Sequence, residues 1–258
     1  MKAFESIRNR FLNRQIAVAV IATGDYVNFL PDLLLSCERH LAPAIRKHYL
    51  LFTDRDVSLN LTHGTFSVHA IENKPWPYVT LMRFHTILGH RHLIRRHRWF
   101  LYLDADMKIV DDIQLADIFD KYKPLTAVHH PAMHNSWNGT FERNPQSTAC
   151  VFGQHKEYFQ GCLWGGEVEA VVAMMETLKE RIDVDLSNEI VAIWHDESHL
   201  NKYLLEEGVP LKMLGPNYAC PENDQRYLAS AKIIHVFKDE GQFVTFPGHS
   251  PPSSPSST

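Results

Sequence analysis

Short apolar runs and amphipathic stretches alternate along the first half of the chain. Ile16–Ala22 is a continuous apolar run rich in β-branched residues, which predicts a strand that is buried on both faces. Apolar residues then recur at helical spacing from Phe29 to about Lys47 and predict a helix. A second apolar run, His48–Asp54, predicts the next strand. Strand, helix and strand in this order are typical of an open α/β sheet.

The rest of the pattern predicts further strands separated by helices. A short strand at Ser67–Ile71 precedes a helix from Val79 to about His97, and the strand Arg98–Leu103 follows. Later segments predict strands at Leu125–His130 and Leu163–Trp164. They predict helices at Gly166–Arg181 and from near Asp196 to just before Gly208. We therefore predict an α/β fold in one domain, residues 1–246, followed by a disordered Pro/Ser-rich tail, residues 247–258.

The composition is ordinary for a globular protein and argues against several classes of partner. Lysine and arginine number 26 against 30 aspartates and glutamates, and a net charge of −4 gives no reason to expect nucleic acid or an anionic membrane as a partner. The longest apolar runs are too short to span a bilayer, and residues 1–14 lack the apolar core of a signal peptide. The four cysteines have no zinc-ligand spacing, which favours reduced thiols and a cytoplasmic protein.

Two carboxylates, Asp104 and Asp106, come directly after the predicted strand Arg98–Leu103. Ligands of open α/β folds bind at the carboxyl ends of the strands, where these side chains are expected. Carboxylate oxygens suit Mn²⁺ or Mg²⁺, and such an ion can neutralise a diphosphate leaving group. Solvated loops carry the same pattern of acids, so on this motif alone both interpretations stay open.

A second group of polar residues, Trp194-His195-Asp196-Glu197, stands at the start of a predicted amphipathic helix. The helix dipole favours a carboxylate in the first turn, so we expect these acids to be ionised. An ionised carboxylate in a cleft can attack an anomeric carbon or stabilise an oxocarbenium ion, and Trp194 offers a flat face to a sugar ring. The simpler alternative is that Asp196 is a helix cap and Glu197 only a favourable N-terminal charge.

Two more segments, residues 141–147 and 161–166, have the polar and glycine content of loops. The pair Gly165-Gly166 before a helix permits close backbone packing or exposes N–H groups to a ligand. The sequence alone does not show which of these two uses applies to the glycine pair.

Three of these motifs together resemble the histo-blood-group ABO and α-1,3-galactosyltransferase family. Residues 194–203, WHDESHLNKY, match a family motif throughout. Asp104-Ala105-Asp106-Met107 is similar to the family's DVDM, and residues 142–147, ERNPQS, are similar to its ERRPQS. Weaker similarity at Ile21–Tyr26 and Lys74–Arg83 extends the resemblance over about residues 16–240.

The resemblance implies a GT-A fold, in which a Rossmann-like nucleotide-binding half joins an acceptor-binding half around one cleft. It implies transfer of galactose or N-acetylgalactosamine from the UDP-sugar to the 3-hydroxyl of a β-galactoside, with retention of configuration. The expected partners are therefore a UDP-sugar donor and an oligosaccharide or glycoconjugate acceptor. Both motif aspartates are present in this chain, so we expect dependence on Mn²⁺, with Mg²⁺ as the alternative. The family's membrane anchor is not found in this sequence, so we expect a cytoplasmic microbial or viral member of the family.

The resemblance also assigns roles to individual residues. Glu197 matches the catalytic nucleophile or oxocarbenium stabiliser, and Asp104 and Asp106 match the metal ligands. The expected donor-binding residues are Ile21, Ala22, Thr23, Tyr26, Arg83, Asp104, Ala105, Asp106, Cys162, His195, Asp196 and Lys238. The expected acceptor-binding residues are His130, Thr140, Gln160 and Trp194.

Two departures from the family pattern affect the expected substrates. Cys162 is larger than the glycine of some relatives and leaves less room for an acetamido group, which favours UDP-galactose as donor. Pro221 replaces an acidic acceptor contact, so the acceptor stays open. Two other functions are considered: a glycoside hydrolase that uses Glu197 with another acid, and a non-catalytic carbohydrate-binding protein. The presence of both aspartates together with Glu197 disfavours the latter.

Overall fold

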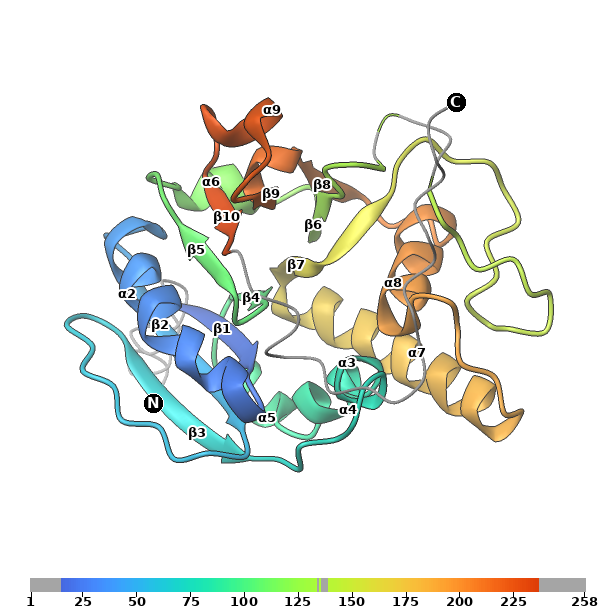
Figure 1. Cartoon of the computed structure of the whole chain (residues 1–258), viewed down its shortest axis with the longest axis horizontal. Coiled ribbons are helices and arrows are strands. Elements are labelled where there is room, and N and C mark those ends of the chain that lie inside the picture. Colours follow the sequence, from blue (N-terminus) through green and yellow to red (C-terminus); the bar gives the residue numbers. More distant parts are fainter. Residues whose placement is uncertain (1–14, 134, 136–138, 237–258) are drawn as a thin grey trace, which may run out of the picture.

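A mainly parallel sheet runs through the middle of the protein (Figure 1), and the computed structural model describes residues 15–133, 135 and 139–236. Seven strands form this sheet, in the order β3 (Thr65–Ala70), β2 (Arg46–Thr53), β1 (Gln15–Ile21), β4 (Trp99–Leu103), β7 (Phe159–Glu167), β6 (Leu125–His129) and β8 (Leu211–Leu214). Within this sheet β7 is antiparallel to β4 and β6, and the other neighbouring pairs are parallel. The predicted α/β class is confirmed, and the sheet is that of a GT-A-like fold.

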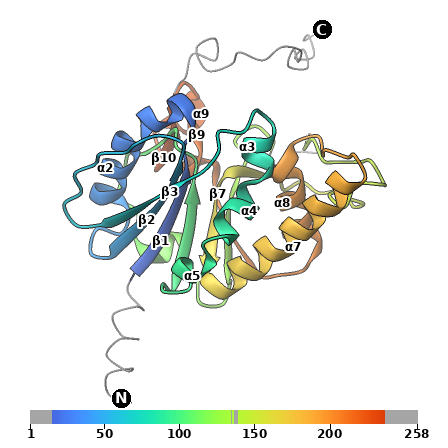
Figure 2. The same ribbon diagram turned by 90° about the horizontal axis from the view of Figure 1, so that it is seen from below.

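Helices cover both faces of the sheet (Figure 2). In the described part of the chain these are η1 (Gly24–Phe29), α2 (Leu30–His40), α3 (Tyr78–Leu81), α4 (Arg83–Leu88), α5 (Arg91–Ile94), α6 (Leu115–Ile118), α7 (Val168–Ser187), α8 (His195–Glu206), η2 (Pro216–Tyr218) and α9 (Gln225–Leu228). Val18 and Val20 of β1 pack with α2 in one hydrophobic core, whereas Ala17 and Ala19 pack with α4 and α7 in another. The first apolar run is therefore a strand buried on both faces, as predicted.

A small second sheet adjoins the end of β4. It consists of β5 (Met107–Ile109), β10 (Ile233–His235) and β9 (Cys220–Pro221). Because β5 begins directly after Asp106, the two motif aspartates lie in the connection between the two sheets. The backbone N–H of Val236 donates to the carbonyl oxygen of Asp106 at 2.9 Å and holds this connection against the C-terminal segment.

Two predicted helices have different boundaries in the structure. The helix expected to reach Lys47 ends at His40, because Leu41 is extended, Ala42 has a φ of +40° and proline at position 43 has no N–H to continue the helix. The helix expected from Val79 to His97 is divided into α3, α4 and α5, because Met82 and His90 leave the helical conformation. The apolar stripe is therefore kept across three short helices.

The segment 161–166 is not a loop but the second half of β7. A Cβ atom at Gly165 would lie 2.2 Å from the carbonyl oxygen of Phe100, and one at Gly166 would lie 2.0 Å from that of Pro124. Glycine is required here because two neighbouring strands approach the backbone of β7 from either side. The close-packing use of the glycine pair is thus confirmed, and the loop prediction is wrong. The strand is also longer than predicted, and α7 continues to Ser187 rather than Arg181.

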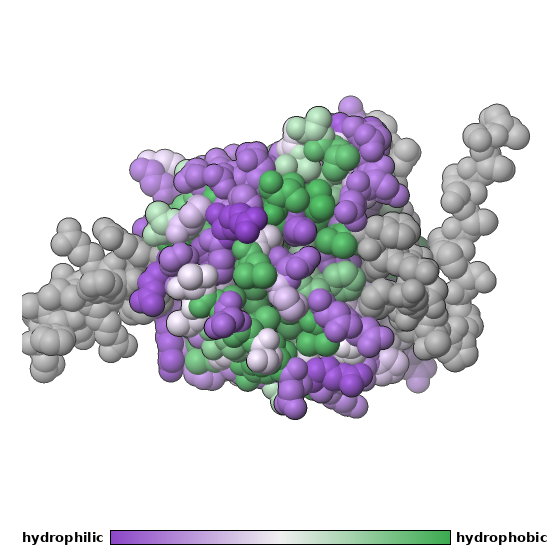
Figure 3. Space-filling model, turned by 60° about the vertical axis from the view of Figure 1, so that its left-hand side comes forward, coloured by the Kyte–Doolittle hydropathy of each residue, from purple (hydrophilic) through white to green (hydrophobic). Residues whose placement is uncertain are grey.

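Figure 3 brings forward the side of the protein that carries α2 and β3, where hydrophobic residues show between hydrophilic ones. Exposed apolar side chains include Leu35 of α2 and Val68 of β3. Among the residues that the structure describes, no helix has the length and hydrophobicity needed to cross a bilayer. The predicted tail at 247–258 lies outside the described residues.

Candidate active site

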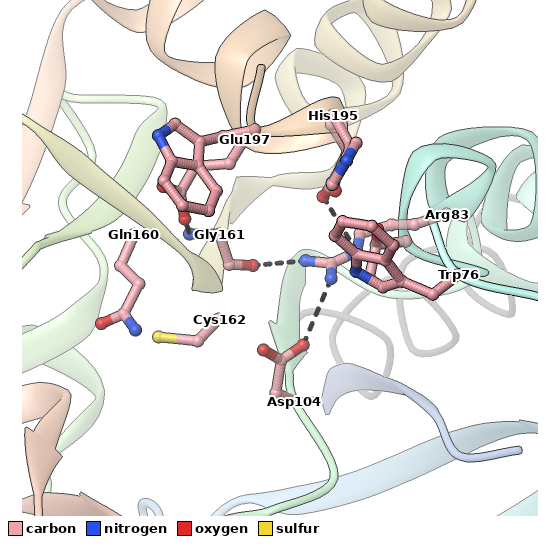
Figure 4. Close-up of a pocket in the computed structure, with 11 residues that line it drawn as sticks. Trp76, Arg83, Asp104, Gln160, Gly161, Cys162, His195 and Glu197 are labelled. Atoms are coloured by element: carbon pink, nitrogen blue, oxygen red, sulfur yellow. Dashed lines mark hydrogen bonds and ion pairs between the residues drawn. The ribbon is translucent and has the colours of Figure 1, made fainter. Parts of the chain in front are cut away.

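A cavity of about 200 Å³ opens at the edge of the central sheet where β4 ends (Figure 4). Asp104 follows the last residue of β4 and lines this cavity, as expected for a ligand site at the carboxyl end of a parallel strand. The other walls come from distant parts of the sequence: Trp76, Thr80 and Arg83, residues 160–162 of β7, and residues 194–197 at the start of α8. The fold therefore brings Asp104 and the WHDE segment to one cavity.

Arg83 joins these walls to one another. Its Nε lies 3.2 Å from Oδ2 of Asp196, and its Nη2 lies 3.4 Å from Oδ1 of Asp104. Its Nη1 donates to the carbonyl oxygen of Gly161, and its guanidinium group stacks 4.5 Å from the centre of the Tyr102 ring. Burial opposes the charged guanidinium, but the facing carboxylates outweigh burial and raise the pKa of Arg83 above its ordinary value. Arg83 is thus a fixed cation between two acids.

Glu197 points from the first turn of α8 toward β7. Its Oε1 accepts a hydrogen bond from the Tyr158 hydroxyl at 2.8 Å, and its Oε2 accepts one from the backbone N–H of Gly161 at 2.7 Å. The surrounding protein removes the carboxyl group from bulk water and raises the pKa of Glu197 to about 7, and the Asp196 charge adds to this effect. Desolvation thus opposes the ionised form of Glu197 that the helix dipole and both hydrogen bonds favour, a contribution that the sequence does not reveal.

A buried amide fixes the start of α8 against β7. The Nδ2 of Asn201 donates to the carbonyl oxygens of Phe159 at 2.8 Å and Glu197 at 3.0 Å, and its Oδ1 accepts from the Phe159 N–H at 2.9 Å. Asn201 is only 1% exposed, so water cannot satisfy its amide group, and these three hydrogen bonds within the protein do so instead. The position of Glu197 relative to β7 is therefore set by hydrogen bonds and not by packing alone.

Asp196 is buried at the bottom of the cavity beside Arg83. Burial raises the pKa of Asp196 to about 6, although the Arg83 charge lowers it. The residue is not the helix cap of the alternative interpretation, because Trp194 occupies the N-cap position and Asp196 lies in the first turn of α8. Its ion pair with Arg83, rather than the helix end, accounts for its position.

Asp104 and Asp106 supply hard oxygen atoms at the end of β4. Asp104 accepts a hydrogen bond from the Tyr102 hydroxyl at 2.8 Å, and its second oxygen points away from Arg83 (Figure 4). Asp106 is nearly buried, with His235 Nδ1 at 4.0 Å from its Oδ1. Within the described ranges no three His, Cys, Asp or Glu side chains converge on one metal position. Asp104 lines the cavity and Asp106 does not. Both supply the hard oxygen atoms that divalent ions prefer, and their assignment as metal ligands stays a prediction.

The expected donor-binding residues Ile21, Ala22, Thr23 and Tyr26 lie at or just after the end of β1, at the same edge of the sheet as Asp104. Ile21 ends β1, which is parallel to β4, and Ala22 donates its N–H to the carbonyl oxygen of Phe52 at 2.9 Å. Thr23 is nearly buried and accepts the backbone N–H of Tyr26 at 3.2 Å. These residues do not line the cavity described above. Their assignment to the nucleotide stays a prediction.

The remaining expected site residues are divided between the cavity and its surroundings. Gln160, Cys162, Trp194 and His195 line it, whereas Ala105 is buried beside it. The His195 ring packs edge-on against Trp76 at 4.6 Å between ring centres, and burial lowers the pKa of His195 to about 4.

Two of the expected acceptor contacts stand further off. His130 follows β6 and meets the Tyr158 ring edge-on at 5.8 Å, while the Thr140 hydroxyl lies 3.9 Å from the Met133 sulfur. Neither residue lines the cavity. Lys238 lies outside the described residues.

Sequence reasoning missed several residues that form the site. Tyr102 had a detectable signal, because it stands two residues before Asp104 on the same face of a strand. Tyr158 gave no local signal, because its partner is far away in the sequence. Asn201 lies in the motif at residues 194–203, but its role was not apparent, because its partners are backbone atoms. Trp76 and Thr80 fall in the weakly similar segment and could be found only by seeing that this segment reaches the cavity.

Comparison with known proteins gives one family and several relatives. The model of glycosyltransferase family 6 matches residues 4–243. The histo-blood group ABO system transferase 2 of Rattus norvegicus is 32% identical over 235 residues, which are 87% of this chain and 68% of the relative. The O-antigen biosynthesis glycosyltransferase WbnI of Escherichia coli is 30% identical, over 80% of this chain and 88% of the relative.

A third relative is the globoside alpha-1,3-N-acetylgalactosaminyltransferase 1 of Gallus gallus. It is 29% identical over 80% of this chain and 62% of its own length. The matched region thus makes up about two thirds of these animal relatives and most of the bacterial one.

Proposed function

Because this chain belongs to glycosyltransferase family 6 and is a hexosyltransferase, we propose that it moves galactose from UDP-galactose to the 3-hydroxyl of a β-galactoside acceptor. The proposed reaction retains the anomeric configuration and depends on Mn²⁺, with Mg²⁺ as the alternative ion and N-acetylgalactosamine as the alternative sugar. The observation that carries this proposal is the cavity in which Asp104 and Glu197 are brought together by Arg83 and Gly161. The names of two relatives, an α-1,3-N-acetylgalactosaminyltransferase and an α-1,3-galactosyltransferase, support the linkage.

In this proposal the diphosphate lies at the end of β4. Asp104 and Asp106 would hold the divalent ion there, and the ion would supply positive charge against the leaving group. Arg83 keeps Asp104 oriented through its ion pair and the stacked Tyr102 ring.

The donor sugar would lie between Asp196 and Glu197. Asp196 is held by Arg83 and can accept hydrogen bonds from sugar hydroxyls. The bond between the anomeric carbon and the diphosphate oxygen breaks, and its electron pair leaves with UDP. Glu197 stabilises the positive charge on the anomeric carbon, either through its field or by a transient covalent bond. The acceptor oxygen then bonds to this carbon on the face that UDP left, and its proton passes to the departing phosphate.

An assay of four reactions tests this function. UDP-galactose and UDP-N-acetylgalactosamine are each offered with a β-galactoside acceptor, with Mn²⁺ or with a chelator, and the linkage of the product is determined by NMR. We expect an α-1,3-linked product only with added metal. Release of free sugar from a glycoside without any UDP-sugar would instead identify a hydrolase, and acceptor binding without turnover would identify a binding protein.

The proposed metal ligands have their own test. Asp104→Asn and Asp106→Asn should each raise the Mn²⁺ concentration for half-maximal activity by about tenfold or more, since a carboxylate ligand is lost. Asp56→Asn removes an exposed carboxylate elsewhere and is the matched control. Unchanged Mn²⁺ dependence in both variants would show that Asp104 and Asp106 are not the metal ligands, but it would not contradict the assignment as a transferase.

A further inference from the structure

Exposed cations gather at the edge of the central sheet opposite the cavity. Strands β2, β1, β4 and β6 all begin there, as the pairing of Gln15 with Arg46 and of residue 16 with Trp99 shows. Arg46 is the first residue of β2, Arg98 immediately precedes β4, and Lys123 stands two residues before β6, and all three are exposed. Each of these three strands therefore brings a positive charge to the same edge.

The chain that leads into β4 adds more positive charge. Residues 73–103 contain six lysines and arginines, four histidines and no aspartate or glutamate. In this stretch Arg91, Arg95 and Arg96 are exposed on or next to α5, which lies at the edge where β1 begins (Figure 2). We call the following set the basic edge: Arg46, Arg91, Arg95, Arg96, Arg98, Lys121 and Lys123. A net charge of −4 conceals this local surplus, which appears only when the fold is known.

The acids near the basic edge neutralise only part of it. Arg95 lies 3.3 Å from the exposed carboxylate of Glu169, and Glu167 pairs with Trp99 across the neighbouring strands. Asp120 lies beside Lys121, and its carboxylate accepts the backbone N–H of Tyr122. Arg98 stacks on the Trp99 ring at 4.9 Å and Lys121 on the Tyr122 ring at 4.5 Å, contacts that leave the positive charges in place. The edge therefore keeps a positive field toward solvent.

We propose that the basic edge binds the surface of an anionic lipid bilayer. Three of its charges stand at the starts of β2, β4 and β6, which are alternate strands of the sheet, so they spread along one edge of the protein, as a planar charged surface requires. Tyr122 is 75% exposed between Lys121 and Lys123, and an aromatic ring beside lysines suits the headgroup region of a bilayer.

The arrangement also sets the direction in which the active site faces. Asp104 lies at the other end of β4, whose five residues separate it from the basic edge by about 16 Å of strand. A bilayer bound at the basic edge therefore leaves the cavity open to water. The protein would be concentrated at a membrane while it acts on acceptors that reach it from the aqueous side.

Vesicle sedimentation of the full chain tests this proposal. The probes are vesicles of phosphatidylcholine alone and of phosphatidylcholine with phosphatidylglycerol, each at low and high salt. We expect binding only to the anionic vesicles, with release at high salt because the attraction is screened. The triple variant R91Q/R96Q/K123Q should bind these vesicles about a hundredfold more weakly, since each basic residue near an anionic leaflet contributes about a factor of five.

The matched control is R55Q/K156Q/R226Q, which removes the same charge from exposed residues elsewhere. It should bind anionic vesicles as the unaltered protein does. Transferase activity on a soluble acceptor, expected to be the same in both triple variants, shows that each is folded. Equal binding to neutral vesicles, equal weakening in both variants, or tighter binding to duplex DNA than to anionic vesicles at the same salt would each overturn the proposal.

Discussion

Tyr158 donates a hydrogen bond to Glu197 over 2.8 Å, although the two residues are 39 positions apart in the sequence. The phenol and the N–H of Gly161 contact different oxygens of the same carboxyl group. Both bonds favour the ionised form of Glu197, whereas the protein around it favours the neutral form. The balance between the two hydrogen bonds and desolvation sets the fraction of Glu197 that is ionised near neutral pH.

Tyr158→Phe should therefore lower transfer activity and shift its pH dependence. Loss of the phenolic donor raises the pKa of Glu197 further above 7, so the acidic limb of the profile of kcat/KM moves to higher pH. At neutral pH we expect a loss of about tenfold or more, since hydrogen bonds to charged groups contribute about 1.5–3 kcal/mol. Tyr122→Phe, which alters an exposed phenol away from the cavity, should leave the profile unchanged. An unshifted acidic limb in Tyr158→Phe would contradict this role.

Glu197→Gln keeps the shape of the side chain and removes its charge. We expect at least a hundredfold loss of kcat, because the glutamine cannot stabilise a cation at the anomeric carbon. Full activity in this variant would exclude the role proposed for Glu197.

The same variant should change how stability depends on pH. The folded pKa of about 7 lies above the ordinary value of 4.5, so the folded protein binds more protons than the unfolded chain between these values. Glu197 thus lowers stability as pH rises from 4.5 to 7, by up to about 3 kcal/mol. The melting temperature of Glu197→Gln, relative to that of the unaltered protein, should therefore rise between pH 5 and pH 8. A difference that stays constant over this range would show that the pKa of Glu197 is not raised.

The sequence predicted those parts of the fold that depend on local pattern. Ile16–Ala22 and Arg98–Leu103 are strands because their apolar runs are buried on both faces, and Asp104 stands where such a strand ends. The glycines of β7 were misread as loop residues, because their requirement comes from the neighbouring carbonyl groups of Phe100 and Pro124. Close approach between strands leaves no periodic signal in the sequence.

The site was predicted only in part, because contacts between distant segments leave no signal in the sequence either. Resemblance to a family supplied Arg83, Asp104 and Glu197, but not the contacts that hold them together. The fork of Arg83 spans three segments, and Asn201 binds backbone atoms, so neither contact follows from residue type or spacing. Such contacts are set by the assembled fold.

Arg83→Lys tests whether the geometry of the cation matters as well as its charge. Lysine keeps the charge but cannot reach Asp104, Asp196 and the Gly161 carbonyl together, because it lacks a planar fork. We expect kcat/KM to fall by about a hundredfold and unfolding to need about 1–3 kcal/mol less, since one buried acid loses its partner. Steady-state kinetics and thermal denaturation measure both effects. Arg95→Lys changes an exposed ion pair and should alter neither.

Cys162→Gly tests the proposed choice of donor sugar. Cys162 is 2% exposed and lines the cavity next to Gln160, so its thiol occupies space near the expected donor sugar. Removing the side chain should raise kcat/KM for UDP-N-acetylgalactosamine relative to UDP-galactose by about tenfold, because small changes in the volume of a pocket contribute about 1–3 kcal/mol to discrimination.

Cys150→Gly removes a buried thiol that does not line the cavity and is the matched control for general loosening of the fold. Its donor ratio should remain that of the unaltered protein. The two donors are compared in one reaction by mass spectrometry of the products. If Cys162→Gly leaves the ratio unchanged while Cys150→Gly does the same, the thiol does not face the acetamido position, and donor choice must be assigned to another wall of the cavity.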